Sequence, residues 1–237
     1  MILDQVMSAL AAKGSESTKR TFLRHGAKEP FFGVKVGEMK LIVKNLKLKG
    51  EQALALQLYA TGNGDAQYLA GMIANGTQMT RAQLQQWADT AAWDMISGTT
   101  VPWVAAEHPN GFALALQWID SPKEHLRRAG WTTLSALAAT VPDEQLPIKE
   151  LARLLDRVAR TLSAAPDGVR YVMNGFVIAS GTYIAALGKP AIATARKLGR
   201  VEVDLGDTAC QVPDAESSII KSRRGAPVAP KRKTVRC

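Results

Sequence analysis

Apolar residues recur at helical spacing along almost the whole chain, and this pattern restricts the fold more than any other feature. In MKLIVKNLKL, Met39, Ile42, Val43 and Leu46 fall at i, i+3, i+4 and i+7, which places them on one face of a helix. Turn signals such as TGNGD, HPNG and AAPDG separate this stretch from further segments of the same kind. The predicted helical segments are 39–48, 52–60, 65–74, 80–96, 99–107, 111–119, 123–139, 147–163, 167–187 and 190–199. The one strand candidate, VEVDL at 201–205, is short, so we expect an all-α fold.

The short loops between these segments favour stacked antiparallel helix pairs, and one internal repeat supports the same arrangement. The dipeptide GW at 130–131 aligns with GF at 175–176, a separation of 45 residues. A period of this length is typical of HEAT-type helical repeats. We therefore predict an α-α superhelix, a solenoid of HEAT-like repeats with an extended concave face. We expect one such domain over residues 1–216 and a basic, flexible tail over 217–237.

Positive charge is concentrated at the two ends of the chain. The formal net charge is +9; residues 1–50 carry ten Lys or Arg against four Asp or Glu, and residues 216–237 carry seven against one. Such a localised basic excess indicates a polyanionic partner, with nucleic acid as the first candidate. For the tail two interpretations stay open, an electrostatic arm on nucleic acid or a solvated chain end.

We expect no cofactor, metal or membrane. Cys210 and Cys237 form neither a disulfide framework nor a zinc site, and the three histidines are scattered without ligand spacing. The apolar run 171–188 is interrupted by polar residues and glycines, which favours a buried helix over a membrane span. The first residues lack the basic segment of a secretion signal. We expect a monomeric cytoplasmic protein, since this cysteine usage fits a reducing compartment.

All five tryptophans fall within one window of 45 residues, which indicates a dense core segment or an aromatic-lined cleft. In the predicted helix 80–96, Asp89 and Trp93 lie one turn apart on one face. Ser97 continues that face, whereas Asp94 points about 100° away. An aromatic ring, a carboxylate and an arginine beside DNA suit hydrolysis of a weakened glycosidic bond. The alternative is that the tryptophans belong to the core and that Asp89 and Asp94 are ordinary surface acids.

Three stretches of the chain resemble the AlkD-like DNA alkylation-repair family. FFGVKVGEMKLIVK (31–44) is similar to the family's loop that leads into a basic helix. AAWDMISGTTVPWV (91–104) resembles its segment with a catalytic Trp, and SPKEHLRRAGW (121–131) its segment with a DNA-gripping Arg. The resemblance implies a HEAT-like repeat fold and, for active members, excision of N3- and N7-alkylated purines without base flipping, unlike most enzymes that act on bases.

The resemblance also implies roles for individual residues. Trp93 matches the tryptophan that packs on the sugar of the damaged nucleotide, and Arg128 matches the arginine that contacts the backbone. Phe176 is the nearest match to a second aromatic of the cleft, usually Trp; a register two residues later places Ile178 there. The catalytic Asp of the family falls four residues after its first Trp, and Ser97 occupies that position here.

The serine is a departure from the family, because it carries no charge to stabilise a sugar cation. A further basic residue of the family is also replaced, by Ala179 or, in the later register, by Gly181. Asp89 and Asp94 are the candidate substitutes for the missing carboxylate, and Asp89 has the better helical phase.

Two hypotheses follow for the function. The first is a protein that binds alkylated double-stranded DNA and excises the damaged purine, with Trp93, Asp89, Asp94 and Ser97 at the catalytic site. The second is a non-catalytic scaffold of the same fold that binds nucleic acid or a protein. The residues predicted to contact DNA are Arg128, Arg127, Trp131, Phe176, Lys35, Lys40, Lys44 and Lys47. For the two arginines, the alternative is a solvated helix start that pairs with Glu124.

Overall fold

The computed structural model describes residues 2–206 and 210–236, and every regular element in these ranges is a helix. The α-helices are α1 (Ile2–Lys13), α2 (Glu16–Arg24), α3 (Val36–Asn45), α4 (Gln52–Ala60), α5 (Gly64–Ile73), α6 (Arg81–Asp89), α7 (Val101–Ala105), α8 (Gly111–Ile119), α9 (Glu124–Thr140), α10 (Ile148–Thr161), α11 (Asp167–Tyr183), α12 (Gly188–Leu198) and α13 (Ala215–Arg223). Shorter helical segments are η1 (Gly76–Gln78), η2 (Ile96–Thr100), η3 (Asp143–Gln145), η4 (Leu162–Ala164) and η5 (Ala185–Leu187). VEVDL forms no strand, and the all-α prediction is confirmed.

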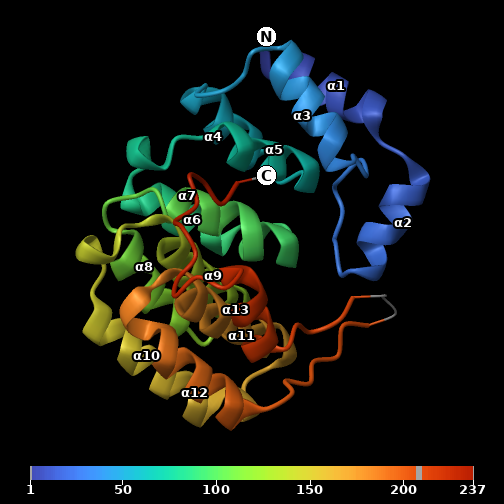
Figure 1. Ribbon diagram of the computed structural model, residues 1–237. Helices are drawn as coiled ribbons and strands as arrows, with labels where there is room; N and C mark the ends of the chain where they lie inside the picture. The colour runs from blue at the N-terminus through green and yellow to red at the C-terminus, as the bar shows by residue number, and fades with distance from the viewer. Residues whose placement is uncertain (1, 207–209, 237) are drawn as a thin grey trace. The chain divides into compact units, whose positions relative to one another are not determined.

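The chain divides into two compact units, which are described separately. The first unit runs to Leu114 and includes Arg236, and the second spans Ala115–Val235 (Figure 1). Helix α5 is almost entirely buried in the first unit, with nine of its ten residues inside. A helix that is buried on all sides must satisfy any polar side chain it carries. For α5 these side chains are Asp65 and Gln67, and both prove central to the candidate site.

Helices α9 and α11 form the centre of the second unit. They pack side by side, and the rings of Trp131 and Phe176 meet between them with centroids 5.2 Å apart. These two residues occupy the positions that the internal repeat aligns, so the repeat reflects equivalent helices. Helices α12 and α13 pack against α11, and α10 packs against α11 and α12. The inward face of α10 carries Leu151, Leu154, Leu155 and Val158.

The apolar run predicted as a buried helix lies in α11 and η5. Met173, Phe176 and Val177 of this stretch are buried, as expected for a core helix. Among the residues described, none of the helices by itself is long and apolar enough to cross a membrane. One pair, Asp167–Tyr183 with Ala185–Leu198, meets the length and composition together but is bent by 118°.

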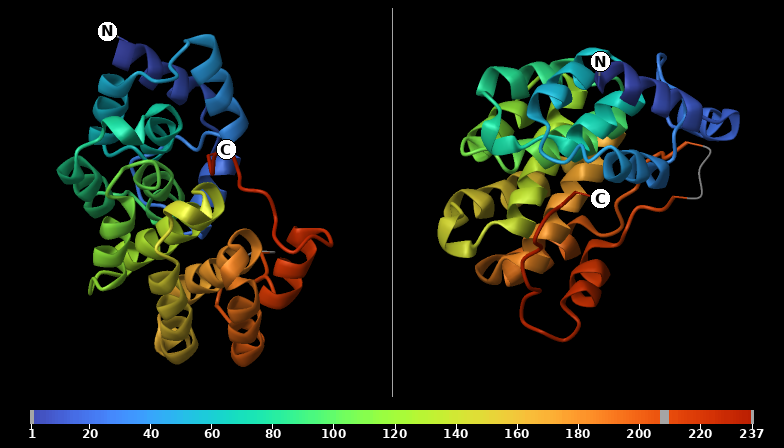
Figure 2. Two further views of the ribbon diagram at one scale, coloured as in Figure 1. Left: turned by 60° about the vertical axis from the view of Figure 1, so that its left-hand side comes forward. Right: turned by 90° about the horizontal axis from the view of Figure 1, so that it is seen from above.

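The C-terminal stretch differs from the flexible tail that the sequence predicted. Helix α13 crosses the predicted boundary at residue 216, because Asp214 caps it by accepting a hydrogen bond from the Ser217 N–H at 2.8 Å. The chain beyond α13, red in Figure 2, donates backbone hydrogen bonds to the carbonyl oxygens of Thr182 and Ala139. The structure therefore places a helix and an anchored irregular segment where a flexible tail was predicted.

Basic side chains of this stretch reach the C-terminal ends of helices in the second unit. The guanidinium of Arg223 donates to the Gly181 carbonyl near the end of α11, with Nε at 3.0 Å. Lys231 Nζ donates to the Ala138 carbonyl near the end of α9 and pairs with Asp143, both at 2.8 Å. A cation at a helix C-terminus is stabilising, because the carbonyl groups there carry partial negative charge.

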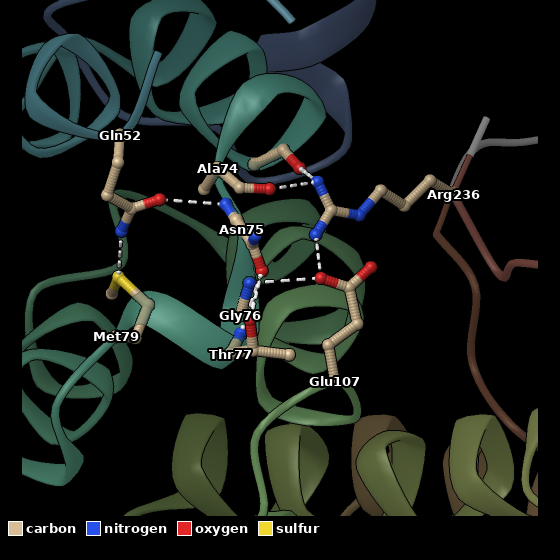
Figure 3. Close-up of polar contacts among 9 residues, drawn as sticks. Gln52, Ala74, Asn75, Gly76, Thr77, Met79, Glu107 and Arg236 are labelled. Atoms are coloured by element: carbon tan, nitrogen blue, oxygen red, sulfur yellow. Dashed lines mark hydrogen bonds and ion pairs between the residues drawn. The ribbon is translucent and has the colours of Figure 1, made fainter. Parts of the chain in front are cut away.

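In the first unit, Arg236 plays the same part for α5. Its guanidinium donates to the Gly71 carbonyl at 3.0 Å and to the Ala74 carbonyl, and it pairs with Glu107 (Figure 3). The same Glu107 oxygen accepts the Gly76 N–H at 3.0 Å. Several basic residues of the tail thus bind the protein's own helix ends.

Candidate nucleic-acid site

The predicted FFGV loop is built onto the N-terminus of α5. Asn63 caps this helix by accepting hydrogen bonds from N–H groups of its first turn at 3.1 Å. The Asp65 carboxylate then accepts three N–H bonds from the loop, from Phe32 at 2.6 Å, Gly33 at 2.9 Å and Val34 at 3.1 Å. Asp65 is 2% exposed, and burial raises its pKa although the three N–H bonds oppose that shift.

Glycine is required within this loop. Gly33 has φ +77°, and a Cβ there would lie 2.7 Å from the Lys19 nitrogen and 2.8 Å from the Ser15 carbonyl oxygen. The Ser15 N–H donates to the Gly33 carbonyl at 3.1 Å. The loop therefore lies directly against the first turn of α2, which carries the next residues of the site.

Three aromatic rings from separate segments meet beside this loop. Trp93 lies 5.3 Å from Phe22 of α2 between ring centroids, and Phe22 lies 6.0 Å from Phe31 of the loop. Lys19 Nζ lies 5.6 Å from the Phe31 ring centre and pairs with Glu29 at 2.7 Å. The other four tryptophans are buried, whereas Trp93 is half-buried. Trp93 therefore exposes more of its surface than the other four tryptophans.

The predicted single helix over 80–96 is wrong. Helix α6 ends at Asp89, residues 90–93 form a connection, and a new helical stretch begins at Asp94. The helix stops because the Gln67 side chain binds the backbone of this connection, donating to the Thr90 carbonyl at 3.0 Å and accepting the Ala92 N–H at 2.8 Å. Asp89 and Trp93 therefore do not lie one turn apart on a single helix, as was predicted.

The acidic candidates stand at the surface. Asp89 is exposed at the end of α6 and accepts a hydrogen bond from the Gln85 amide at 2.8 Å. Asp94 is exposed at the start of the next helical stretch. Asp89 and Asp94 lie on different helices, so Asp89 does not share a helix face with Trp93 as predicted.

Ser97 follows Trp93 by one turn, as the resemblance implies, but its side chain is enclosed. The Ser97 N–H donates to the Trp93 carbonyl at 3.1 Å, and its hydroxyl donates to the Asp94 carbonyl at 3.3 Å. Ser97 has no exposed surface. At the position that the resemblance assigns to a catalytic carboxylate, the chain thus has a small neutral group that bonds to the main chain.

In the second unit, Arg127 and Arg128 are half-buried near the start of α9. A Cβ on Gly168, in the first turn of α11, would collide with the Arg128 guanidinium and approach the Glu124 carboxylate at 2.9 Å. Gly168 therefore makes room for Arg128 beside Glu124. The role of both arginines toward DNA stays a prediction.

Trp131 and Phe176 are not available to DNA, so their assignment as DNA contacts is wrong. Trp131 is 2% exposed and Phe176 is fully buried. The Arg157 guanidinium lies 5.8 Å from the Trp131 ring centre and pairs with Asp120 at 2.7 Å. The family resemblance that matches Phe176 to a cleft aromatic does not fix which face of its helix the ring occupies.

The predicted lysines lie where phosphate groups can reach them. Lys35 follows the FFGV loop directly and precedes α3, Lys40 and Lys44 stand one turn apart on α3, and Lys47 lies just beyond it. All four are exposed. Their contact with DNA stays a prediction.

Sequence reasoning missed Asp65 and Gln67, the two buried polar residues that hold the loops of the site. A signal was present in GDAQYLAGMI, because polar side chains inside an otherwise apolar helix need buried partners. Those partners lie about 25 to 33 residues away in sequence, so the pattern alone does not name them.

A metal centre finds no support in residues 2–206 and 210–236, where no group of three or more His, Cys, Asp or Glu side chains is placed to hold an ion. Cys210 is exposed. Cys237, the other thiol of the sequence, lies outside the described residues.

The architecture and the site together define an all-helical protein with a half-buried tryptophan packed on Phe22 and with exposed lysines on α3. Comparison with known proteins gives the family. Residues 6–198 match the family model described as DNA alkylation repair enzyme, and the chain belongs to this family.

The chain is also similar along nearly its whole length to individual proteins. Uncharacterized proteins Lin0241 of Listeria innocua serovar 6a and Lmo0209 of Listeria monocytogenes serovar 1/2a are each 31% identical over 224 residues, covering 93% of this chain and 96% of theirs. A solved structure matches with a TM-score of 0.88 and 34% identity over 99% of both chains. It is described as a new family of proteins related to the HEAT-like repeat DNA glycosylases with affinity for branched DNA structures. The predicted HEAT-like repeat fold and the family resemblance are confirmed.

Proposed function

We propose that this protein binds branched DNA through the surface around Trp93 and the lysines of α3, and that it does not excise alkylated bases. The observation that carries the proposal is Ser97, which is neutral, enclosed and bonded to the main chain where the family resemblance calls for a carboxylate. Preorganised groups aimed at the charge that develops in a transition state accelerate a reaction, and the loss of a single such group can cost a factor of about 10²–10³ in rate. A serine hydroxyl that points at a backbone carbonyl supplies no such charge.

The acidic substitutes considered from the sequence do not repair this loss. Asp89 belongs to a different helix from Ser97 and is bound by Gln85, and both Asp89 and Asp94 face solvent. A carboxylate in water interacts weakly with a distant charge, because the solvent screens it. DNA binding without excision is therefore the better-supported function. The glycosidic bond of a cationic alkylated purine breaks readily, but neither Asp89 nor Asp94 is enclosed in a way that would assist its cleavage.

The binding surface combines two kinds of contact. The half-buried Trp93 ring, supported by Phe22, offers an aromatic face, and base–aromatic stacking contributes about 1–3 kcal/mol per base. Lys35, Lys40 and Lys44 offer charge to phosphates without sequence preference. A branch point exposes bases that a continuous duplex stacks away, and the similar solved protein has affinity for branched DNA.

Binding is tested by titrating a fluorescently labelled four-way junction, and a linear duplex of the same length, and following anisotropy. We expect tighter binding to the junction and a loss of about 1–3 kcal/mol with Trp93→Ala. The double variant Lys40→Ala/Lys44→Ala should reduce the slope of log K against log salt by about two, one for each phosphate contact. A matched control with the same change of charge is Arg153→Ala/Arg160→Ala on the exposed face of α10.

Catalysis is tested in parallel on duplex DNA that carries one N7-methylguanine. No released base is expected from the unsubstituted protein. Release that disappears in Trp93→Ala would overturn the non-catalytic proposal, and Asp89→Asn and Asp94→Asn would then identify the carboxylate. Equal affinity for the junction and the linear duplex would instead refute the proposed preference for branched DNA.

A further inference from the structure

We infer that Gln67 is a positioning residue that sets the placement of Trp93 for DNA. The inference rests on the proposed function, because it assigns Gln67 a role in binding only if Trp93 contacts DNA. Gln67 is 1% exposed, lies on α5 and does not itself face a ligand. Its amide group instead holds the connection that leads into Trp93.

The amide group of Gln67 bonds to three backbone groups at once. Its Nε2 donates to the Thr90 carbonyl at 3.0 Å and to the Tyr59 carbonyl at 3.4 Å, while its Oε1 accepts the Ala92 N–H at 2.8 Å. Ala92 immediately precedes Trp93. A buried backbone group that loses its hydrogen-bond partner costs about 1–3 kcal/mol of stability. The bonds to Gln67 therefore hold the connection in this position.

Residues on either side of Gln67 hold the rest of the same segment. A Cβ on Gly64, three residues before Gln67, would lie 3.4 Å from Trp93 Nε1, so the indole lies against the start of α5. A Cβ on Gly71, four residues after Gln67, would collide with the Thr100 side chain. Positions i, i+3 and i+7 share one helix face, so a single face of α5 contacts the segment at its start, near Trp93 and at its end.

The chain offers a matched control in the same part of the first unit. Tyr59 is also buried, stacks on Trp87 at 4.0 Å, and donates its hydroxyl to the Trp87 carbonyl at 2.6 Å. Trp87 lies inside α6, before the connection. Tyr59→Phe thus removes one buried hydrogen bond to the same region but leaves the backbone of the connection untouched.

The test compares Gln67→Met, Tyr59→Phe and Trp93→Ala. Met fills the space of Gln but cannot bond to the Thr90 and Ala92 backbones. We expect Gln67→Met to weaken junction binding by about three- to tenfold, part of the loss expected for an aromatic contact. Both Gln67→Met and Tyr59→Phe should lower the melting temperature, because each removes buried hydrogen bonding. Tyr59→Phe should nevertheless leave the affinity for the junction within about twofold, as expected when only a structural hydrogen bond is lost.

Fluorescence gives a readout that a purely structural role would not move. Since the other four tryptophans are buried, acrylamide quenching reports mainly on Trp93. Gln67→Met should change this quenching, Tyr59→Phe should not, and junction DNA should protect the quenched component. Trp93→Ala should abolish it.

The outcomes separate the inference from the function on which it rests. Full junction affinity in folded Gln67→Met, with weakened binding in Trp93→Ala, overturns the positioning role alone. Full affinity in Trp93→Ala overturns the proposed site, and the role of Gln67 falls with it. Should Gln67→Met fail to fold, Gln67→Glu replaces it. A protonated Glu restores one donor and one acceptor, so its junction affinity relative to the unsubstituted protein should recover in acidic buffer, and no recovery would contradict the inference.

Discussion

Replacing Asp65 by asparagine is expected to lower the free energy of unfolding by about 1–3 kcal/mol. Asparagine keeps one acceptor oxygen but places an NH2 donor at the other position. At least one of the three N–H groups of Phe32, Gly33 and Val34 therefore loses its partner, whichever way the amide turns. The bonds to Gly33 and Val34 are buried, so water does not replace them.

The same carboxyl gives the stability a pH dependence of definite sign. Burial raises the pKa of Asp65 in the folded protein above its value in the unfolded chain. Between these two values the folded state binds more protons, and its stability falls as the pH rises. The advantage of the unsubstituted protein over Asp65→Asn should therefore be largest in acid, shrink as the pH passes the raised pKa, and stay constant above it.

Thermal unfolding followed by circular dichroism measures both effects. A loss of 1 kcal/mol lowers the melting temperature of a protein of this size by about 2–4 °C, so a drop of about 2–12 °C is expected. Asp156→Asn, at an exposed position of α10, removes the same charge and should stay within about 0.5 kcal/mol of the unsubstituted protein. An Asp65→Asn protein as stable as this control would refute the reasoning, because the three N–H bonds would then not hold the loop.

Three further predictions concern single substitutions. Arg236→Ala removes the cation from the end of α5 and leaves Glu107 without this ion pair, so chemical denaturation should show a loss of about 1–2 kcal/mol; an unchanged midpoint would mean that the arm is not bound there in solution. Gly33→Ala should cost at least about 2 kcal/mol, because φ is positive and the new Cβ meets the Lys19 backbone; a soluble variant of equal melting temperature would contradict this. Ser97→Asp buries an uncompensated charge, so it should lose about 3–5 kcal/mol and gain no release of N7-methylguanine.

The sequence predicts the all-α fold and the order of most helices well, because apolar spacing and turn residues are local signals. The two aromatic residues that the 45-residue repeat aligns, Trp131 of α9 and Phe176 of α11, meet in the core of the second unit. Helix ends are predicted less well. Residues 90–93 keep a helical pattern, yet they leave the helix because Gln67, distant in sequence, takes their backbone groups.

The candidate site was only partly predictable for the same reason. Trp93, the FFGV loop and the exposed lysines are recognisable from local sequence, and the structure brings Trp93 and the loop together through Phe22. Asp65 bonds to residues more than 30 positions away, and such a pairing has no local signature. The C-terminal stretch shows the same limit. The cap at Asp214 is a local signal for α13. Lys231, by contrast, bonds to the Ala138 carbonyl near the end of α9, a partner 93 residues away that the local sequence does not indicate.

The position of α5 has a consequence for how the protein tolerates change. Its rotation is fixed by Asp65 on the FFGV loop and by Gln67 on the Trp93 segment, and its far end is held by Arg236. A shift of one residue along the helix would break all three sets of contacts together, so intermediate registers have no stabilising partners. The amide protons of α5 should therefore exchange with solvent more slowly than those elsewhere in the first unit. In a saturation scan, substitutions in GDAQYLAG should be rejected more often than changes at Trp93 itself, because they disturb both loops of the site at once.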